Sequence, residues 1–247
     1  MATKFGDFGP AAAVPMSVFK SDQSFFTRYT MALAFFIVFG FAQFSLRGMV
    51  DIRQASLLTH LHGAVMVAWL AVATAQNLLV GRDQLVIHRK LGWIGAALVV
   101  AIALLGVAVG FSAVSGHRVP PFFTDPYFLA LTIVEPIAFA AIVAWAIALR
   151  RRTQWHRRLM LGALILILEP ALGRTLPMPF MIGWGEWVIL AIQLVALAVL
   201  ARHDRKVLGS VHPATIGLMA VVSAIHLIIF ALSIFPPFEA FAAGVAG

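Results

Sequence analysis

The chain has 247 residues, of which 62% are hydrophobic and 11% charged, and its formal net charge is +8. A soluble domain would be about 45–50% apolar and about 25% charged. The composition therefore excludes an ordinary soluble fold and indicates an integral membrane protein. No cysteine is present, which excludes disulfides and thiolate metal sites. Because the positive charge lies in short loops between apolar runs, we attribute it to membrane topology and anionic lipid, and we expect no nucleic-acid partner.

The first 28 residues mix Phe and Pro with charged residues and show no helical period. We predict that residues 1–28 form an N-terminal segment lying at the membrane interface. No cleavable signal peptide is evident, because the first apolar run begins only near residue 30.

Seven apolar runs follow, each close to the roughly 20 residues that cross a bilayer. The predicted fold is an all-α, polytopic seven-helix bundle over residues 29–235, followed by a short C-terminal tail at 236–247. The fifth run is short and ends at two prolines, Pro177 and Pro179. The predicted spans are 29–46, 57–80, 91–114, 127–149, 159–176, 184–201 and 214–235.

The distribution of Lys and Arg predicts the orientation. Fourteen of the 18 basic residues lie in the N-terminal segment and in the loops after the second, fourth and sixth spans, and four lie on the other side. The N-terminus is therefore predicted to be cytoplasmic and the C-terminus outside, in a bacterial inner membrane. Anionic lipid headgroups are expected at the densest basic cluster, which comprises Arg150, Arg151, Arg152, Arg157 and Arg158.

Ionisable residues inside the spans are the first candidates for a functional site, because they are costly in a bilayer. Counting 1.5 Å per residue places four of them in one layer of the outer half of the bundle. His62 is preferred over His60, since the two point about 200° apart and the face of His62 continues to Gln76. The four candidates are His62, Glu135, Glu169 and His226.

Each of the two glutamates directly precedes a proline, in "TIVEPIAF" and "LILEPALGR". A proline frees the carbonyl four residues earlier, which predicts free carbonyls at Thr132 and Leu166 and a kink in each span. The residue types fit three uses. They could ligate a divalent iron, zinc or manganese ion. His62 and His226 could bind haem b from two faces. The same groups could relay protons in a carrier, or pair with one another for structural reasons alone.

Two helix starts on the cytoplasmic side resemble each other, "IHRKLGWIGAAL" and "WHRRLMLGALIL". Their histidines, His88 and His156, could anchor the helices at the interface. They could also bind a quinone head or an anionic headgroup. Retinal is excluded, because every lysine lies outside the spans and none could form a Schiff base.

The succession of "HLHG", "HRKLG" and "HRRLM" over residues 60–162 resembles a loose group of bacterial multi-pass membrane proteins of unknown function, some of them linked to respiratory oxidase assembly. The resemblance implies that His62, His88 and His156 are the histidines of that group, and it favours a respiratory or redox membrane. It implies no reaction.

From these observations we expect an integral inner-membrane protein that is redox-linked and binds haem or a metal ion through His62 and His226. Glu135 and Glu169 would be ligands or proton carriers. Two alternatives stay open at this stage. One is a non-enzymatic subunit or assembly factor of a respiratory or photosynthetic complex, and the other is a proton-coupled carrier.

Overall fold

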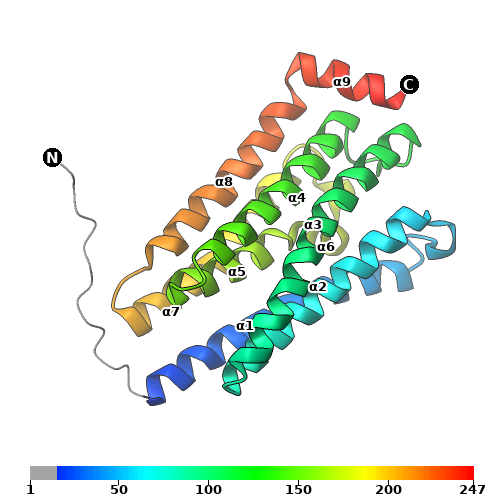
Figure 1. Ribbon diagram of the computed structural model, residues 1–247. Coiled ribbons are helices and arrows are strands. Elements are labelled where there is room, and N and C mark those ends of the chain that lie inside the picture. Colours follow the sequence, from blue (N-terminus) through cyan, green and yellow to red (C-terminus); the bar gives the residue numbers. More distant parts are fainter. Residues whose placement is uncertain (1–15) are drawn as a thin grey trace.

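The computed structural model describes residues 16–247, and every regular element in that range is helical (Figure 1). Successive long helices run in alternating directions and pack mainly on their sequence neighbours. Two short 3-10 turns, at Ile52–Gln54 and Met178–Phe180, interrupt the loops. The helices are α1 Met16–Leu46, α2 Leu57–Gly81, α3 Leu85–Ser115, α4 Asp125–Ala148, α5 Thr153–Leu166, α6 Glu169–Thr175, α7 Gly185–Leu208, α8 Pro213–Ser233 and α9 Pro236–Ala246.

Six of these helices are long and apolar enough to cross a membrane. They are α1, α2, α3, α4, α7 and α8, and they correspond to six of the seven predicted spans. Between 17% and 33% of each span's apolar window is buried within the protein, so much of their surface faces outward. Apolar helices with so much exposed apolar surface are stable only in lipid, which makes the chain a multi-pass membrane protein.

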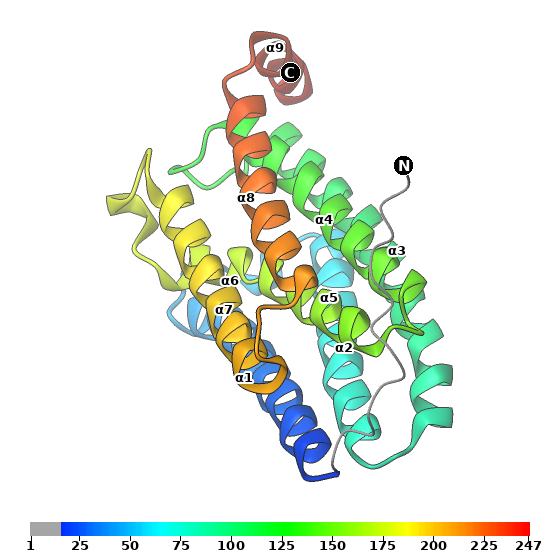
Figure 2. The same cartoon turned by 90° about the vertical axis from the view of Figure 1, so that its left-hand side faces the viewer.

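The fifth predicted span is broken into α5 and α6, with Ile167 and Leu168 between them. Every residue from 161 to 169 is buried, and α5 contacts α1, α4, α7 and α8. Figure 2 shows α5 in the middle of the bundle, with α8 on one side and α1 on the other. A broken helix is tolerated at membrane depth where protein surrounds it. The 14-residue α5 is therefore an interior element, and a count of seven spans stays a prediction.

The two ends of the chain differ from the sequence predictions. Residues 1–15 of the predicted interfacial segment lie outside the described residues, but α1 already begins at Met16. Tertiary contacts hold its first turns: Asp22 pairs with Arg157, and Gln23 Nε2 donates to the Asn77 carbonyl at 3.1 Å. The predicted tail is the helix α9, which packs on α3 and α4 around Ala242. Neither the first turns of α1 nor α9 shows a strong helical pattern of apolar residues in the sequence. Contacts with other helices therefore stabilise both as helices.

A glycine sets the closest approach between α5 and α8. A Cβ on Gly162 would lie 2.3 Å from the Leu218 Cδ2 atom, so the two helices pack there without room for any side chain. Gly162 therefore allows a close helix contact, whereas a Cβ on Gly173 would meet nothing within 4 Å among the described residues. This contact lies between the two polar regions of the interior.

The first polar region lies where α5, α7 and α8 meet, at the end of the bundle that carries most Arg and Lys. Arg158 and Asp204 are both fully buried and form an ion pair with Nη2–Oδ1 at 2.5 Å. Asp204 also accepts from the Thr215 hydroxyl at 2.6 Å and from the His212 backbone N–H at 3.1 Å. The expectation that Arg158 faces lipid headgroups is therefore wrong, because this guanidinium is an interior group.

Candidate metal centre

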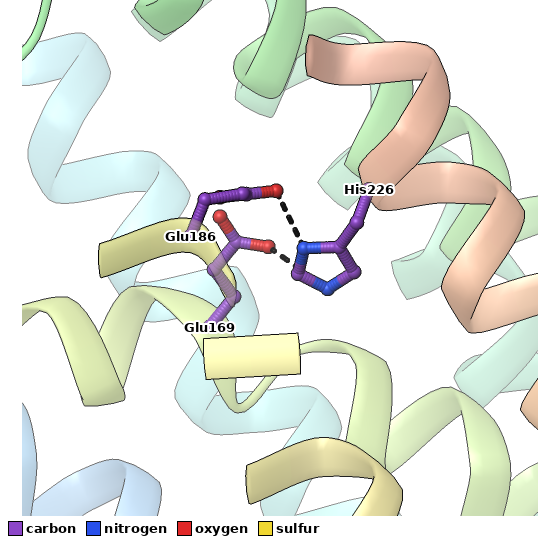
Figure 3. Close-up of side chains that lie close together, drawn as sticks. All are labelled: Glu169, Glu186 and His226. Atoms are coloured by element: carbon purple, nitrogen blue, oxygen red, sulfur yellow. Dashed lines mark hydrogen bonds and ion pairs between the residues drawn. The ribbon is translucent and has the colours of Figure 1, made fainter. Parts of the chain in front are cut away.

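The second polar region joins α6, α7 and α8 in the core. Glu169, Glu186 and His226 each offer a metal-ligating atom, and these atoms all lie within 4.8 Å of one another. His226 Nδ1 lies 2.5 Å from Glu186 Oε1, and His226 Nε2 lies 3.9 Å from Glu169 Oε2. Figure 3 shows both carboxyl groups directed at the imidazole ring. His226 is fully buried, Glu169 is 3% exposed and Glu186 is 9% exposed.

Local sequence explains the position of Glu169. It begins α6 directly after the break, and Pro170 occupies the first turn of that helix, where a missing N–H costs little. The proline therefore allows the chain to restart a helix at this point rather than kink a continuous one. As a result the Glu169 carboxyl group lies in the interior, at the start of α6.

Glu186 lies in the first turn of α7, immediately after the loop that follows α6. The N-terminal end of a helix carries a partial positive charge, which favours a carboxylate at this position. The Tyr127 hydroxyl, on α4, donates a hydrogen bond to Glu186 Oε2. Glu186 is thus held by a hydrogen-bond donor, a helix terminus and His226 together.

Hydrogen bonding defines which atoms face His226. Gln193 Nε2 donates to the Leu166 carbonyl at 2.8 Å, and a carbonyl can only accept. Gln193 Oε1 is therefore the atom that lies 2.7 Å from His226 Nε2, so this nitrogen carries a proton and donates it. The predicted release of the Leu166 carbonyl from its helix is confirmed, and a side chain two helices away in sequence takes its place as donor. Gln193 therefore links the end of α5 at Leu166 to His226.

Two carboxylate oxygens in this layer have no hydrogen-bond partner among the described residues. They are Glu169 Oε2 and Glu135 Oε1, both buried. Glu135 lies on α4 and is 6% exposed, near enough to Glu169 and Glu186 for their charges to interact. This layer holds three buried carboxyl groups, two of which converge on His226, and carboxylates cannot all keep their charge in such a place without a compensating cation. The layer is therefore short of positive charge or of protons.

The structure brings the four predicted residues together only in part. Glu169 and His226 belong to the three-residue group, whereas His62 and Glu135 lie outside it. His62 does face inward: its Nδ1 is buried without a partner, and on the same helix face Trp69 and Ala73 are buried. A Cβ on Gly106 would lie 3.0 Å from Pro136 Cγ and 3.5 Å from His62 Cε1, which places His62 beside the Glu-Pro segment of α4.

The two histidines of the repeated motif lie close to each other. The rings of His88 on α3 and His156 on α5 are 6.4 Å apart between centroids. His156 Nδ1 donates to the Ala146 carbonyl at 2.8 Å, and His88 Nδ1 is buried without a partner. The structure therefore brings the two motifs together at one end of the bundle. The binding of a quinone or a lipid headgroup there stays a prediction.

Sequence reasoning missed Glu186 and Tyr127. Glu186 lies two residues inside the predicted sixth span, so its position resembled that of an ordinary interfacial acid. One signal was available: Glu186 and Gln193 are seven residues apart and therefore share a helix face. A carboxylate and an amide on one face of an apolar helix indicate a polar partner on a neighbouring helix.

Comparisons of the chain with protein-family models, with curated proteins and with solved structures find no match.

Proposed function

We propose that this integral membrane protein binds one divalent transition-metal ion between Glu169, Glu186 and His226. The observation that carries the proposal is the convergence of three buried ligand side chains from three helices, with ligand atoms within 4.8 Å of one another. Metal–ligand bonds to His nitrogen and carboxylate oxygen are about 2.0–2.2 Å long. Small side-chain rotations would bring these atoms to such distances from a shared ion.

Charge balance supports a divalent ion. Two carboxylates and a neutral histidine offset a charge of +2, so binding would remove the excess of negative charge that Glu169 and Glu186 create. The unpartnered oxygen Glu169 Oε2 would then gain a ligand. Glu135, which lies outside the group, would stay available as a neighbouring acid.

The partners of His226 also suit a metal ligand. A metal-bound histidine donates its other ring N–H to a protein acceptor, which fixes the ring. Here Nε2 donates to Gln193 Oε1, and this arrangement leaves Nδ1 as the ligand atom, on the side of Glu186. Gln193 is in turn fixed by the Leu166 carbonyl. Tyr127 orients Glu186 in the same manner from α4.

The ligand set favours iron, manganese or zinc, since imidazole and carboxylate together suit these ions. A non-haem ion fits better than haem b, because both nitrogens of His226 already face protein oxygens and His62 lies outside the group. Iron or manganese would support the redox-linked role predicted from the sequence. Zinc would support only acid–base or structural chemistry, because it has no redox states.

Elemental analysis of the purified protein tests the proposal. We expect close to one iron, manganese or zinc ion per chain in the wild type, and loss of most of it in Glu169→Gln. Glu239→Gln, which removes an exposed carboxylate on α9, is the matched control and should keep the metal. Metal-free wild-type protein after growth and purification with each of the three metals would overturn the proposal. A visible spectrum with a Soret band would replace it by a haem site.

A second candidate function, proton-coupled transport, is favoured by a different observation. Hydrogen bonds connect Tyr127, Glu186, His226, Gln193 and the Leu166 carbonyl in one continuous chain. The titratable part of this chain, Tyr127, Glu186 and His226, can hold and pass protons within a bundle. Reconstitution in vesicles separates the candidates: a carrier would move protons with a solute and lose this flux in His226→Asn without any metal being present.

A further inference from the structure

A groove of about 390 Å³ lies between α1 and α2, and it shares no residue with the metal centre. It lies where α2 ends, at the end of the bundle that carries the Arg-rich loops. Its lining is more polar than an outward-facing membrane surface requires. The lining residues are Gln23, Ser24, Thr27, Arg28, Asn77, Leu78, Gly81 and Arg82.

Hydrogen bonds between the helices fix the inner wall of this groove. Gln23 is buried, and its Nε2 donates to the Thr27 hydroxyl at 3.3 Å and to the Asn77 carbonyl at 3.1 Å. Asn77 Nδ2 donates to the Thr30 hydroxyl at 3.2 Å. The wall is therefore preorganised by polar contacts from both helices, which lowers the cost of binding a ligand against it.

Two arginines at the groove are available for a ligand. Arg28 and Arg82 are exposed, and among residues 22–247 neither guanidinium has a carboxylate partner. Arg157 and Arg158, at the same end of the bundle, are instead paired with Asp22 and Asp204. A guanidinium binds a phosphate through two parallel hydrogen bonds, so a pair of them around a groove is suited to a phosphate group.

The surface beside the groove is apolar. Leu78 at its edge is 37% exposed, and Met31 and Phe35 of α1 are 46% and 71% exposed. An amphipathic ligand can place a phosphate between the arginines and its hydrocarbon chains along these side chains. From this charge pattern we propose that the groove binds the headgroup of an anionic phospholipid.

Native mass spectrometry of the full-length protein in detergent tests this proposal. The probes are phosphatidylglycerol, which is anionic, and phosphatidylcholine, which has no net charge. We expect the wild type to retain phosphatidylglycerol at least tenfold more strongly, and the double variant Arg28→Gln/Arg82→Gln to lose that preference. Arg202→Gln/Arg205→Gln removes the same charge from exposed positions near the end of α7 and should keep the preference.

Three results would overturn the proposal. One is equal retention of the two lipids by the wild type. Another is an equal loss of preference in both double variants, which would indicate a diffuse effect of net charge. The third is displacement of the lipid by millimolar inorganic phosphate, which would make the groove a site for a soluble phosphate. The metal content of the Arg28→Gln/Arg82→Gln variant should be unchanged, so this test is independent of the metal centre.

Discussion

Two polar regions within the described part of the interior accommodate buried charge in different ways. Around Arg158 and Asp204, one cation meets one anion, and both oxygens of the carboxylate have donors. Around His226, two carboxylates converge on one ring, and Glu169 Oε2 has no partner. A balanced network stabilises the fold without further components. An unbalanced network costs stability unless a proton or a cation completes it, and this difference makes the second region the candidate metal site.

The largest expected effect is a loss of stability when the buried cation of the first region, Arg158, is removed. Arg158→Met leaves Asp204 buried without its cation, and we expect the free energy of unfolding to fall by about 3–5 kcal/mol. Chemical denaturation in detergent micelles measures this loss. Arg151→Met, at an exposed position, is the control and should change stability by less than about 0.5 kcal/mol. Equal stabilities of the two variants would mean that the buried pair is not what holds this end together.

The next largest loss of stability is expected at the close contact between α5 and α8, which lies between the two polar regions. Gly162→Ala places a methyl group against Leu218, and we expect a loss of about 1–3 kcal/mol from overpacking. Gly173→Ala, where a Cβ meets nothing, is the matched control. Because α5 leads to α6 and α8 carries His226, Gly162→Ala should also lower the metal content. A Gly162→Ala protein as stable as Gly173→Ala would show that α5 and α8 are packed less closely.

Around His226, removal of a charged group should have the opposite effect on stability from its removal around Arg158 and Asp204. In metal-free protein, Glu169→Gln removes an unpaired buried carboxyl group, so stability should stay the same or rise by up to about 1 kcal/mol. Glu186→Gln removes a group bonded to Tyr127 and His226 and should cost about 1–3 kcal/mol. Denaturation of both variants after treatment with a chelator makes the comparison. A cost for Glu169→Gln as large as for Glu186→Gln would remove the distinction between paired and unpaired acids.

The smallest effect is a dependence on pH at the balanced region. Burial, and then the positive charge of Arg158, lower the pKa of His212 from 6.5 to about 4. The unfolded chain therefore binds a proton that the folded chain does not, and stability falls as the pH drops from 6.5 towards 4. His212→Asn keeps a side-chain acceptor for the Ala214 N–H and should flatten the slope in this window. Melting temperatures measured from pH 7 to pH 4 would contradict this account if both proteins had the same slope.

Much of the fold was predictable from hydropathy, because six spans are long apolar runs with exposed lipid-facing surface. The inward face of His62 and the free carbonyl of Leu166 followed from helical period and from proline chemistry. The start of α1 at Met16 was not predictable, since contacts of Asp22 and Gln23 with distant helices hold it.

The candidate site was predictable only in part, for a physical reason. Depth along a span places residues in a layer, but it does not define which faces of the helices meet. Glu169 and His226 share a layer and meet, whereas His62 shares the layer and does not join the group. Glu186 was overlooked because an acid in the first turn of a helix is an ordinary feature at a membrane surface. Glu186 is buried because of the path of the loop after α6, and the path of a loop cannot be predicted from a periodic sequence pattern.

The most direct test of the metal centre is X-ray absorption at the K-edge of whichever metal copurifies with the protein. We predict a first shell of oxygen and nitrogen at about 2.0–2.2 Å. We also predict the outer-shell scattering of one imidazole, which should disappear in His226→Asn. An imidazole signal that survives in His226→Asn, or a wild-type protein with no bound metal to measure, would contradict the account.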